Sequence, residues 1–459
     1  MKRLVIAVIA LAVVLAAAYG IGAARRDAIY RDLIEQGDAA LAGGDVSAAI
    51  ESFSGAVLLK DGAMVGYLKR GESYRRRGDF DAALRDLRRA MELDPTATRP
   101  RELLGDVNYA LERYVRAAER YREFLALDDR SPRVLYKLGL ALHQAGQPGA
   151  AIESLRKAIE LEEDLPEAHY VLGLCLREAQ QPKAALAVLE RAVALAPTLL
   201  HAREELADLY GRVGRPDSRI RQLDALLALD PRPSREVALG QAYAASGDQA
   251  SAVQTLVRAL RRYPGYRYTY VALGRVWLED AEARDDRVAL GKAVEALESA
   301  AGVADTSETL MLLGRAQLLS GDVPLAERTL QQATERLPVD PLAFFYLADA
   351  AERRGHVEIA RGALIDFHAL DGDDGNRRRL SRLSARVADL SMQLADFSTA
   401  AAWYQRAADA TPQDPSLLVR LAEAQWRAGR GDAARATVGK ALEIDPAHVS
   451  AAALKARIK

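Results

Sequence analysis

Cysteine and histidine are scarce in this chain of 459 residues, which has one cysteine, Cys175, and six histidines. A single cysteine allows neither an intramolecular disulfide nor a thiolate zinc site. No two histidines have metal-ligand spacing, and no Walker loop, Rossmann fingerprint or G-x-S-x-G motif is present. The sequence therefore predicts no catalytic residues, no metal site and no cofactor. The helical context of Cys175 predicts an inert, buried thiol.

An excess of charge of one sign is also lacking. The formal net charge is −1, so the basic surface that bulk nucleic-acid binding needs is absent. Aromatic residues make up only 6% of the chain, whereas hydrophobic residues make up 50%. This composition, rich in alanine and leucine, suits helices that pack through small side chains. A chain this long usually divides into separate cores, unless it repeats one small unit.

A small residue does recur along almost the whole chain, and most neighbours in this series are 34 residues apart. An alanine usually follows twelve residues later, and a large apolar residue four residues after that, as in Gly139, Ala151 and Leu155. Two antiparallel helices approach closely only where side chains are small, and a large apolar side chain fills the adjoining gap. The series comprises Gly37, Gly71, Gly105, Gly139, Gly173, Ala207, Gly240, Gly274, Gly314, Ala348, Ala388 and Ala422.

Glycines and prolines punctuate the repeats. Prolines such as Pro95 and Pro446 fall where the second helix of a pair ends. Glycines fall where the first helix must stop and turn, at Gly44, Gly78, Gly146, Gly214, Gly247, Gly321, Gly355 and Gly429. Each period therefore predicts two helices joined by a short turn.

With this period and these positions, the chain closely resembles the tetratricopeptide repeat family from about Tyr30 to Pro446. The resemblance implies an all-α fold: a right-handed α-solenoid of about twelve helix hairpins over residues 30–446, with a concave groove lined by the first helix of each pair. Two inserts, near 279–288 and 371–379, are expected to form loops. Residues 447–459 are expected to form a capping helix over the last repeat.

The amino terminus is a separate element. After a basic start at 1–3, residues 4–24 carry no charge, and about 21 residues of helix span roughly 31 Å, enough to cross a bilayer. We expect a transmembrane signal-anchor followed by a linker at 25–29, with the repeats extracytoplasmic. A cleaved signal peptide ending near Ala18, and hence a secreted or periplasmic protein, is the alternative.

Long cations and tyrosines gather on the expected groove helices of the second to fifth repeats. Acidic residues such as Glu102 and Asp106 lie among them, so the alternative is a solvated charged face. Cations beside tyrosines suit an acidic, partly aromatic peptide, through charge-assisted hydrogen bonds and cation–π contacts. The candidate peptide-binding residues are Lys69, Arg75, Arg76, Arg99, Tyr109, Arg133, Tyr136, Lys137, Tyr170 and Arg177.

A second candidate patch lies further along the chain. It combines the tyrosine-rich stretch 263–270 with apolar residues of the ninth and tenth repeats, and its candidates are Tyr268, Met311, Phe345 and Tyr346. If exposed, such residues mark an interface. We expect Tyr268 and Phe345 to be exposed, and Leu312 and Leu319 to belong to the core between repeats.

Two subtypes of the family bind peptides through asparagines on the groove helices. This chain has only Asn108 and Asn376, so neither arrangement is supported. The leading hypothesis is a membrane-tethered scaffold that binds protein or peptide partners and supports assembly of an envelope or secretion complex. The alternative is an exported accessory protein that binds a glycan or small ligand through the tyrosine-rich stretch.

Overall fold

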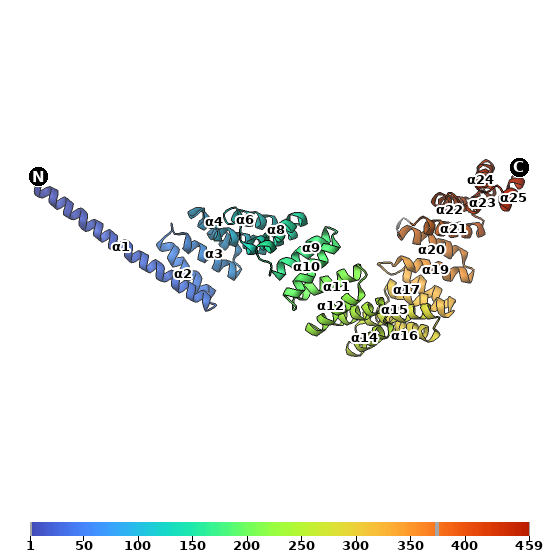
Figure 1. The fold of residues 1–459 in the computed structure, drawn as a ribbon, viewed down its shortest axis with the longest axis horizontal. Coiled ribbons are helices and arrows are strands. Elements are labelled where there is room, and N and C mark those ends of the chain that lie inside the picture. The colour runs from blue at the N-terminus through green and yellow to red at the C-terminus, as the bar shows by residue number, and fades with distance from the viewer. Residues whose placement is uncertain (1, 372–375, 459) are drawn as a thin grey trace. The chain divides into compact units, whose positions relative to one another are not determined.

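The computed structural model describes residues 2–371 and 376–458, without the side chains of 2–10, 12 and 13. All regular structure in this part of the chain is α-helical (Figure 1), and it falls into two units, 1–222 and 223–459. The helices of the first unit are α1 (Lys2–Ala42), α2 (Val46–Leu59), α3 (Met64–Arg77), α4 (Phe80–Leu93), α5 (Arg99–Ala110), α6 (Tyr114–Leu125), α7 (Pro132–Gln144), α8 (Pro148–Leu161), α9 (Pro166–Glu178), α10 (Pro182–Leu195) and α11 (Leu200–Arg212).

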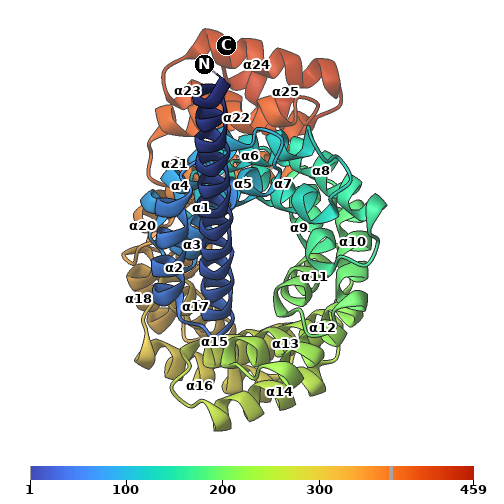
Figure 2. The same cartoon turned by 90° about the vertical axis from the view of Figure 1, so that its left-hand side faces the viewer.

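Helix α12 (Pro216–Leu229) contains the boundary between the units. In each unit, successive helix pairs follow one another in chain order (Figure 2). The helices of the second unit are α13 (Pro233–Ala245), α14 (Gln249–Arg262), α15 (Arg267–Arg284), α16 (Arg287–Val303), α17 (Ser307–Ser320), α18 (Val323–Thr334), α19 (Pro341–Arg354), α20 (Val357–Leu370), α21 (Arg377–Gln393), α22 (Phe397–Ala410), α23 (Pro415–Arg427), α24 (Gly431–Ile444) and α25 (Val449–Arg457).

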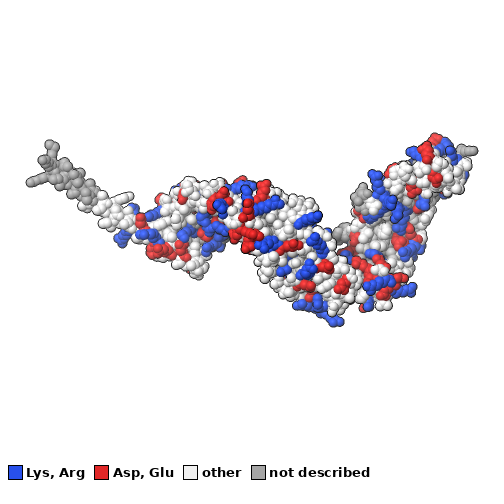
Figure 3. All heavy atoms as spheres, viewed as in Figure 1, with Lys and Arg blue, Asp and Glu red and all other residues white. Residues whose placement is uncertain are grey.

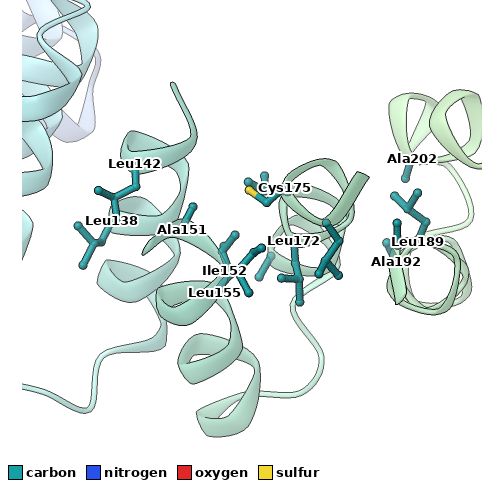
Figure 4. Packing of buried hydrophobic residues seen from close by; sticks show 14 of the residues in the cluster. Leu138, Leu142, Ala151, Ile152, Leu155, Leu172, Cys175, Leu189, Ala192 and Ala202 are labelled. Atoms are coloured by element: carbon teal, nitrogen blue, oxygen red, sulfur yellow. The ribbon is translucent and has the colours of Figure 1, made fainter. Parts of the chain in front are cut away.

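The small residues stand where the two helices of a pair approach most closely. A Cβ atom added at Gly139 would lie only 2.5 Å from Leu155 Cγ. Leu155 and Ala151 are fully buried in a continuous core that extends to Leu172 of the next repeat and on to Leu189, which lies beside Ala192 (Figure 4). Each pair thus closes over one large side chain, and its outer face packs on the next pair. The predicted hairpins are confirmed.

Helix ends have the predicted turn chemistry. Each of the eight glycines predicted to stop a first helix has a positive φ, for example 88° at Gly78. This left-handed conformation is open to glycine without steric cost. Several second helices begin at an aspartate whose carboxylate accepts a backbone N–H, as Asp45 does from Ala48 at 2.9 Å.

The first insert does not form a loop, contrary to expectation. It lengthens both helices of its pair: α15 has 18 residues and α16 has 17, whereas α3 and α4 have 14 each. The segment 279–284 is rich in alanine, glutamate and arginine, which favour helix. Asp286 then begins α16 by accepting the N–H of Val288 at 2.8 Å. Of the second insert, residues 372–375 lie outside the described residues, and Arg377 onward belongs to α21.

Helix α1 runs without a break through residues 25–29, which the sequence assigned to a linker. Its amino-terminal half extends beyond α2 (Figure 1), and Leu15 and Ile21 are exposed on it. Among the described residues, no helix combines the length and apolar character that a membrane span requires. Much of the predicted segment 4–24 has side chains outside that description, so the anchor stays a prediction.

Two further features concern the core. Ala451 and Leu454 of α25, and Ile458 directly after it, pack in one core with the last helix pair. Cys175 is 0% exposed among leucines of its repeat, and burial raises the pKa of its thiol to about 12. Cys175 is therefore a buried and unreactive thiol, as predicted.

Candidate partner-binding groove

The ten candidate residues of the second to fifth repeats all lie on the first helices of their pairs: α3, α5, α7 and α9. We call the face that these helices share the early groove. Acidic and basic side chains alternate over this part of the molecule (Figure 3). These cations are available to a ligand only where they are not already paired with carboxylates of the chain itself.

A repeated ion pair links neighbouring repeats. A cation two residues before the small residue reaches an aspartate one residue after the small residue of the preceding repeat. Lys69 Nζ lies 2.6 Å from Asp38, and Lys137 Nζ lies 2.8 Å from Asp106. In the second unit, Arg420 lies 3.1 Å from Asp389 by the same spacing of 31 residues. We call this series of ion pairs the ladder.

A buried carboxylate, Glu102, lies beside the ladder and shares Lys137 with it. Its side chain is 0% exposed, and it accepts from Lys137 at 2.7 Å, from Arg99 at 2.9 Å and from Arg133. Burial alone would raise the pKa of the Glu102 carboxyl, but Lys137, Arg133 and Arg99 together hold this pKa below its ordinary value. The carboxylate therefore stays charged and fixes three cations from two repeats.

The tyrosines of the second helices also join the ladder. Tyr121 Oη donates to Asp106 at 2.8 Å, and Tyr404 donates to Asp389 in the second unit. Burial and the neighbouring carboxylates raise the pKa of both hydroxyls well above the ordinary tyrosine value. Asp106 and Asp389 thus each accept a hydrogen bond from a tyrosine of their own helix pair and bind a cation of the next repeat through both carboxylate oxygens.

The early groove is therefore a largely neutralised surface. Arg177 is also paired, with Glu205 of the next repeat. Arg76 lies 3.4 Å from Glu72 and is exposed, and Arg75 is partly buried. The three candidate tyrosines, Tyr109, Tyr136 and Tyr170, are partly buried against the core. Most of the cations assigned to an acidic peptide instead hold the repeats together.

A single exposed ion pair of the ladder should contribute little to the stability of the fold. We expect Lys69→Met to lower the free energy of unfolding by less than about 1 kcal/mol, because Lys69 and Asp38 are both partly exposed. The difference should nearly vanish in about 1 M salt, where the Debye length is about 3 Å. Urea unfolding followed by circular dichroism measures it. Lys183→Met, at an exposed lysine outside the ladder, is the control. A loss above about 2 kcal/mol in Lys69→Met would contradict the weak contribution expected of this pair.

The second candidate patch is only partly a surface. Tyr268 is 49% exposed, as expected, but Met311 is 4% exposed and cannot be part of a binding patch, because it packs into the core between repeats. Phe345 and Tyr346 are partly buried. Leu312 is buried, as expected, whereas Leu319 is exposed, contrary to expectation.

Aromatic rings replace parts of the ladder here. Arg315 and Tyr346 stand 31 residues apart at the two ladder positions, and the guanidinium of Arg315 lies 5.4 Å from the ring centroid. Phe345 packs edge-on against Tyr346 at 5.5 Å, and the guanidinium of Arg386 lies 5.7 Å from the Phe345 ring. We call the face shared by α15, α17, α19 and α21 the late groove.

The late groove contains a pocket that the sequence reasoning missed. It has a volume of about 520 Å³, and Phe345 of α19 contributes to its lining. The remaining lining is mainly from α21: Arg378, Arg379, Arg382, Leu383 and Arg386. The signal was present in the run 377–386, where arginines recur three and four residues apart and so share a helix face. Basic side chains also gather near this end of the second unit in Figure 3.

Three family models, each described as tetratricopeptide repeat, match the chain. One matches residues 68–132, 104–164, 136–199 and 311–367, another 237–266, and the third 391–458. These matches cover repeats in both units. No curated protein matches the chain.

Solved structures of helical-repeat proteins are similar to parts of the chain. A MamA protein is 28% identical over 36% of this chain and 92% of its own, with a TM-score of 0.34. YrrB, described as a TPR protein with an unusual peptide-binding site, is 23% identical over 41% of this chain and 96% of its own, with a TM-score of 0.37. PilF of Pseudomonas aeruginosa is 24% identical over 46% and 96%, with a TM-score of 0.38.

Proposed function

Because the chain belongs to the tetratricopeptide repeat family, we propose that it is a non-catalytic scaffold that binds partner proteins or peptides on the groove face of its helix pairs. One observation indicates where on the molecule such partners would bind. The late groove presents partly exposed aromatic rings beside arginines, including Tyr268, Phe345 and Arg386. Aromatic residues and arginine are enriched where proteins bind one another.

We also propose that residues 4–24 tether this scaffold to a membrane, with the repeats on the extracytoplasmic side. The uncharged run after a basic start supports the tether. Such a scaffold would hold partners near the membrane and support assembly of an envelope or secretion complex. Cleavage of the segment, giving a secreted or periplasmic protein, is the alternative.

Site-specific photo-cross-linking in the native membrane tests the scaffold proposal. We expect benzoylphenylalanine in place of Tyr268 or Leu319, exposed on the first helices α15 and α17, to give discrete protein adducts. The matched controls are Val288 and Val303, which are exposed on the second helix α16. They should give none, because they lie on the second helix. The absence of adducts at every position, or equal adducts at all four, would contradict the proposal.

A glycan or small ligand at Tyr268 is the second candidate function. Its ring is half exposed and lies 5.3 Å from the Tyr266 ring, which resembles a stacking platform. However, the Arg267 guanidinium lies 4.8 Å from the Tyr268 ring centroid and donates to its hydroxyl at 2.9 Å. Arg267 thus already occupies part of the Tyr268 surface that a ligand would contact. Heat on titration with soluble glycans that disappears in Tyr268→Ala would favour this candidate over the scaffold.

A further inference from the structure

We propose that the pocket formed by the first turns of α21 and by Phe345 binds an acidic segment of a partner protein, with an aromatic or aliphatic side chain between its carboxylates. This inference rests on the proposed scaffold function and names the chemistry of its partner. Unpaired arginines, an apolar lining and the size of the pocket support it.

Two of the four pocket arginines are already engaged. Arg379 is paired with Asp371, and Arg386 lies 2.7 Å from Glu352 and 3.8 Å from Asp349. Arg378 and Arg382 are exposed, and neither forms an ion pair or hydrogen bond within the described part of the chain. Their guanidinium groups are therefore available to a ligand.

The spacing of these two arginines fits two carboxylates. Arg378 and Arg382 are four residues apart on α21, so they project from the same face one turn apart. A guanidinium can bind a carboxylate through two parallel hydrogen bonds. The pocket thus offers unpaired arginines, whereas in the early groove the cations of the ladder are already paired with carboxylates of the chain.

The apolar part of the pocket is fixed in place. Phe345 packs at 5.5 Å against Tyr346 and at 5.4 Å against the buried Phe367, so its ring is held from two sides. Leu383 contributes a second apolar side chain to the lining. An entirely polar anion would leave this surface uncovered, whereas a peptide with one large apolar side chain would cover it.

The surroundings favour a short peptide over a long polyanion. A volume of about 520 Å³ fits a few side chains. Asp349, Glu352 and Asp371 lie next to the pocket, each beside the arginine that it binds. The phosphates of an extended nucleic acid would meet these carboxylates, and with a net charge of −1 the chain has no overall excess of basic residues to bind further phosphates.

The test uses the full-length chain in detergent and fluorescence polarisation. The probe is a fluorescein-labelled peptide of glutamates around one central phenylalanine. The neutral control peptide has glutamine in place of every glutamate, and oligothymidylate is the competing polyanion. We expect Arg382→Glu to weaken binding of the acidic peptide about tenfold or more, because a charge-assisted hydrogen bond is replaced by repulsion.

The matched control is Arg377→Glu, which makes the same charge change at an exposed arginine that does not line the pocket. It should change binding by less than about threefold, because screening weakens the long-range effect of charge. A glutamate at the first residue of α21 is also favourable for the helix. Arg382→Gln, with an unchanged circular dichroism spectrum, separates loss of the contact from loss of the fold.

Three results would overturn the inference: equal weakening by Arg382→Glu and Arg377→Glu, equal binding of the neutral peptide, or binding of oligothymidylate in preference to the acidic peptide. The scaffold proposal is tested separately. If the adducts at Tyr268 and Leu319 persist in Arg382→Glu while the peptide result is negative, the inference fails and the scaffold stands.

Discussion

Glu102→Ala should lower the free energy of unfolding by about 3 kcal/mol, because it removes a buried carboxylate that binds three cations and leaves Arg133 unpaired, although Lys137 keeps Asp106 and Arg99 keeps Glu72. Glu102 is 0% exposed and binds Arg99, Arg133 and Lys137. Arg99 and Arg133 are partly exposed and can turn to water, so the loss should fall at the lower end of the range for buried pairs. Urea unfolding with hydrogen exchange over α5 and α7 measures it.

Glu163→Ala is the control for this loss. Glu163 lies 3.3 Å from Arg191, and its side chain is 76% exposed, so its removal should cost less than about 0.5 kcal/mol. Hydrogen exchange should speed up around α5 and α7 in Glu102→Ala and stay unchanged there in Glu163→Ala. Equal losses in the two variants would show that the buried carboxylate is no more important than a surface pair.

The same carboxylate predicts a dependence on pH. The pKa of Glu102 is lowered in the folded chain, so its contribution is complete above the unfolded value of about 4.3 and is lost as pH falls through the folded pKa. The stability difference between the wild type and Glu102→Gln should therefore be constant near neutral pH and shrink below about pH 4. A difference that grew on acidification would have the wrong sign.

The fold was predictable because its information is local. The small residue, the alanine twelve residues later and the large apolar residue all act within one helix pair, as Gly139, Ala151 and Leu155 show. The turns at glycines such as Gly78 were equally predictable, because few residues other than glycine adopt the left-handed conformation that these turns require. The first insert was predicted wrongly because its length was taken to indicate a loop, although the helix-forming residues of 279–284 extend α15.

The groove was less predictable because its charges depend on the neighbouring repeat. Lys137 looks like a free cation until Asp106, 31 residues earlier, is placed beside it. That spacing is present in the sequence and would have revealed the ladder. Met311 shows a different limit: its exposure depends on how three helix pairs pack, and no local pattern separates it from Leu319.

Gly105→Ala should destabilise the first unit by about 1–3 kcal/mol, although alanine favours helix over glycine by about 1 kcal/mol. The added Cβ would lie 2.4 Å from the ring of Tyr121. That ring is buried, and its hydroxyl donates to Asp106 at 2.8 Å, so it cannot turn away without breaking this bond. The two helices must separate instead, and α5 loses contact with its partner.

The matched control should change stability in the opposite direction. Gly149 lies in the first turn of α8, and an added Cβ there would meet nothing within 4 Å, so Gly149→Ala should stabilise the chain by up to about 1 kcal/mol. Alanine does occur opposite a tyrosine elsewhere, at Ala388 and Tyr404, so Gly105→Ala should strain its repeat without unfolding it. Urea unfolding of both variants decides the matter. If both substitutions stabilise, helix propensity outweighs close packing, and the small residue is not what allows the two helices to approach.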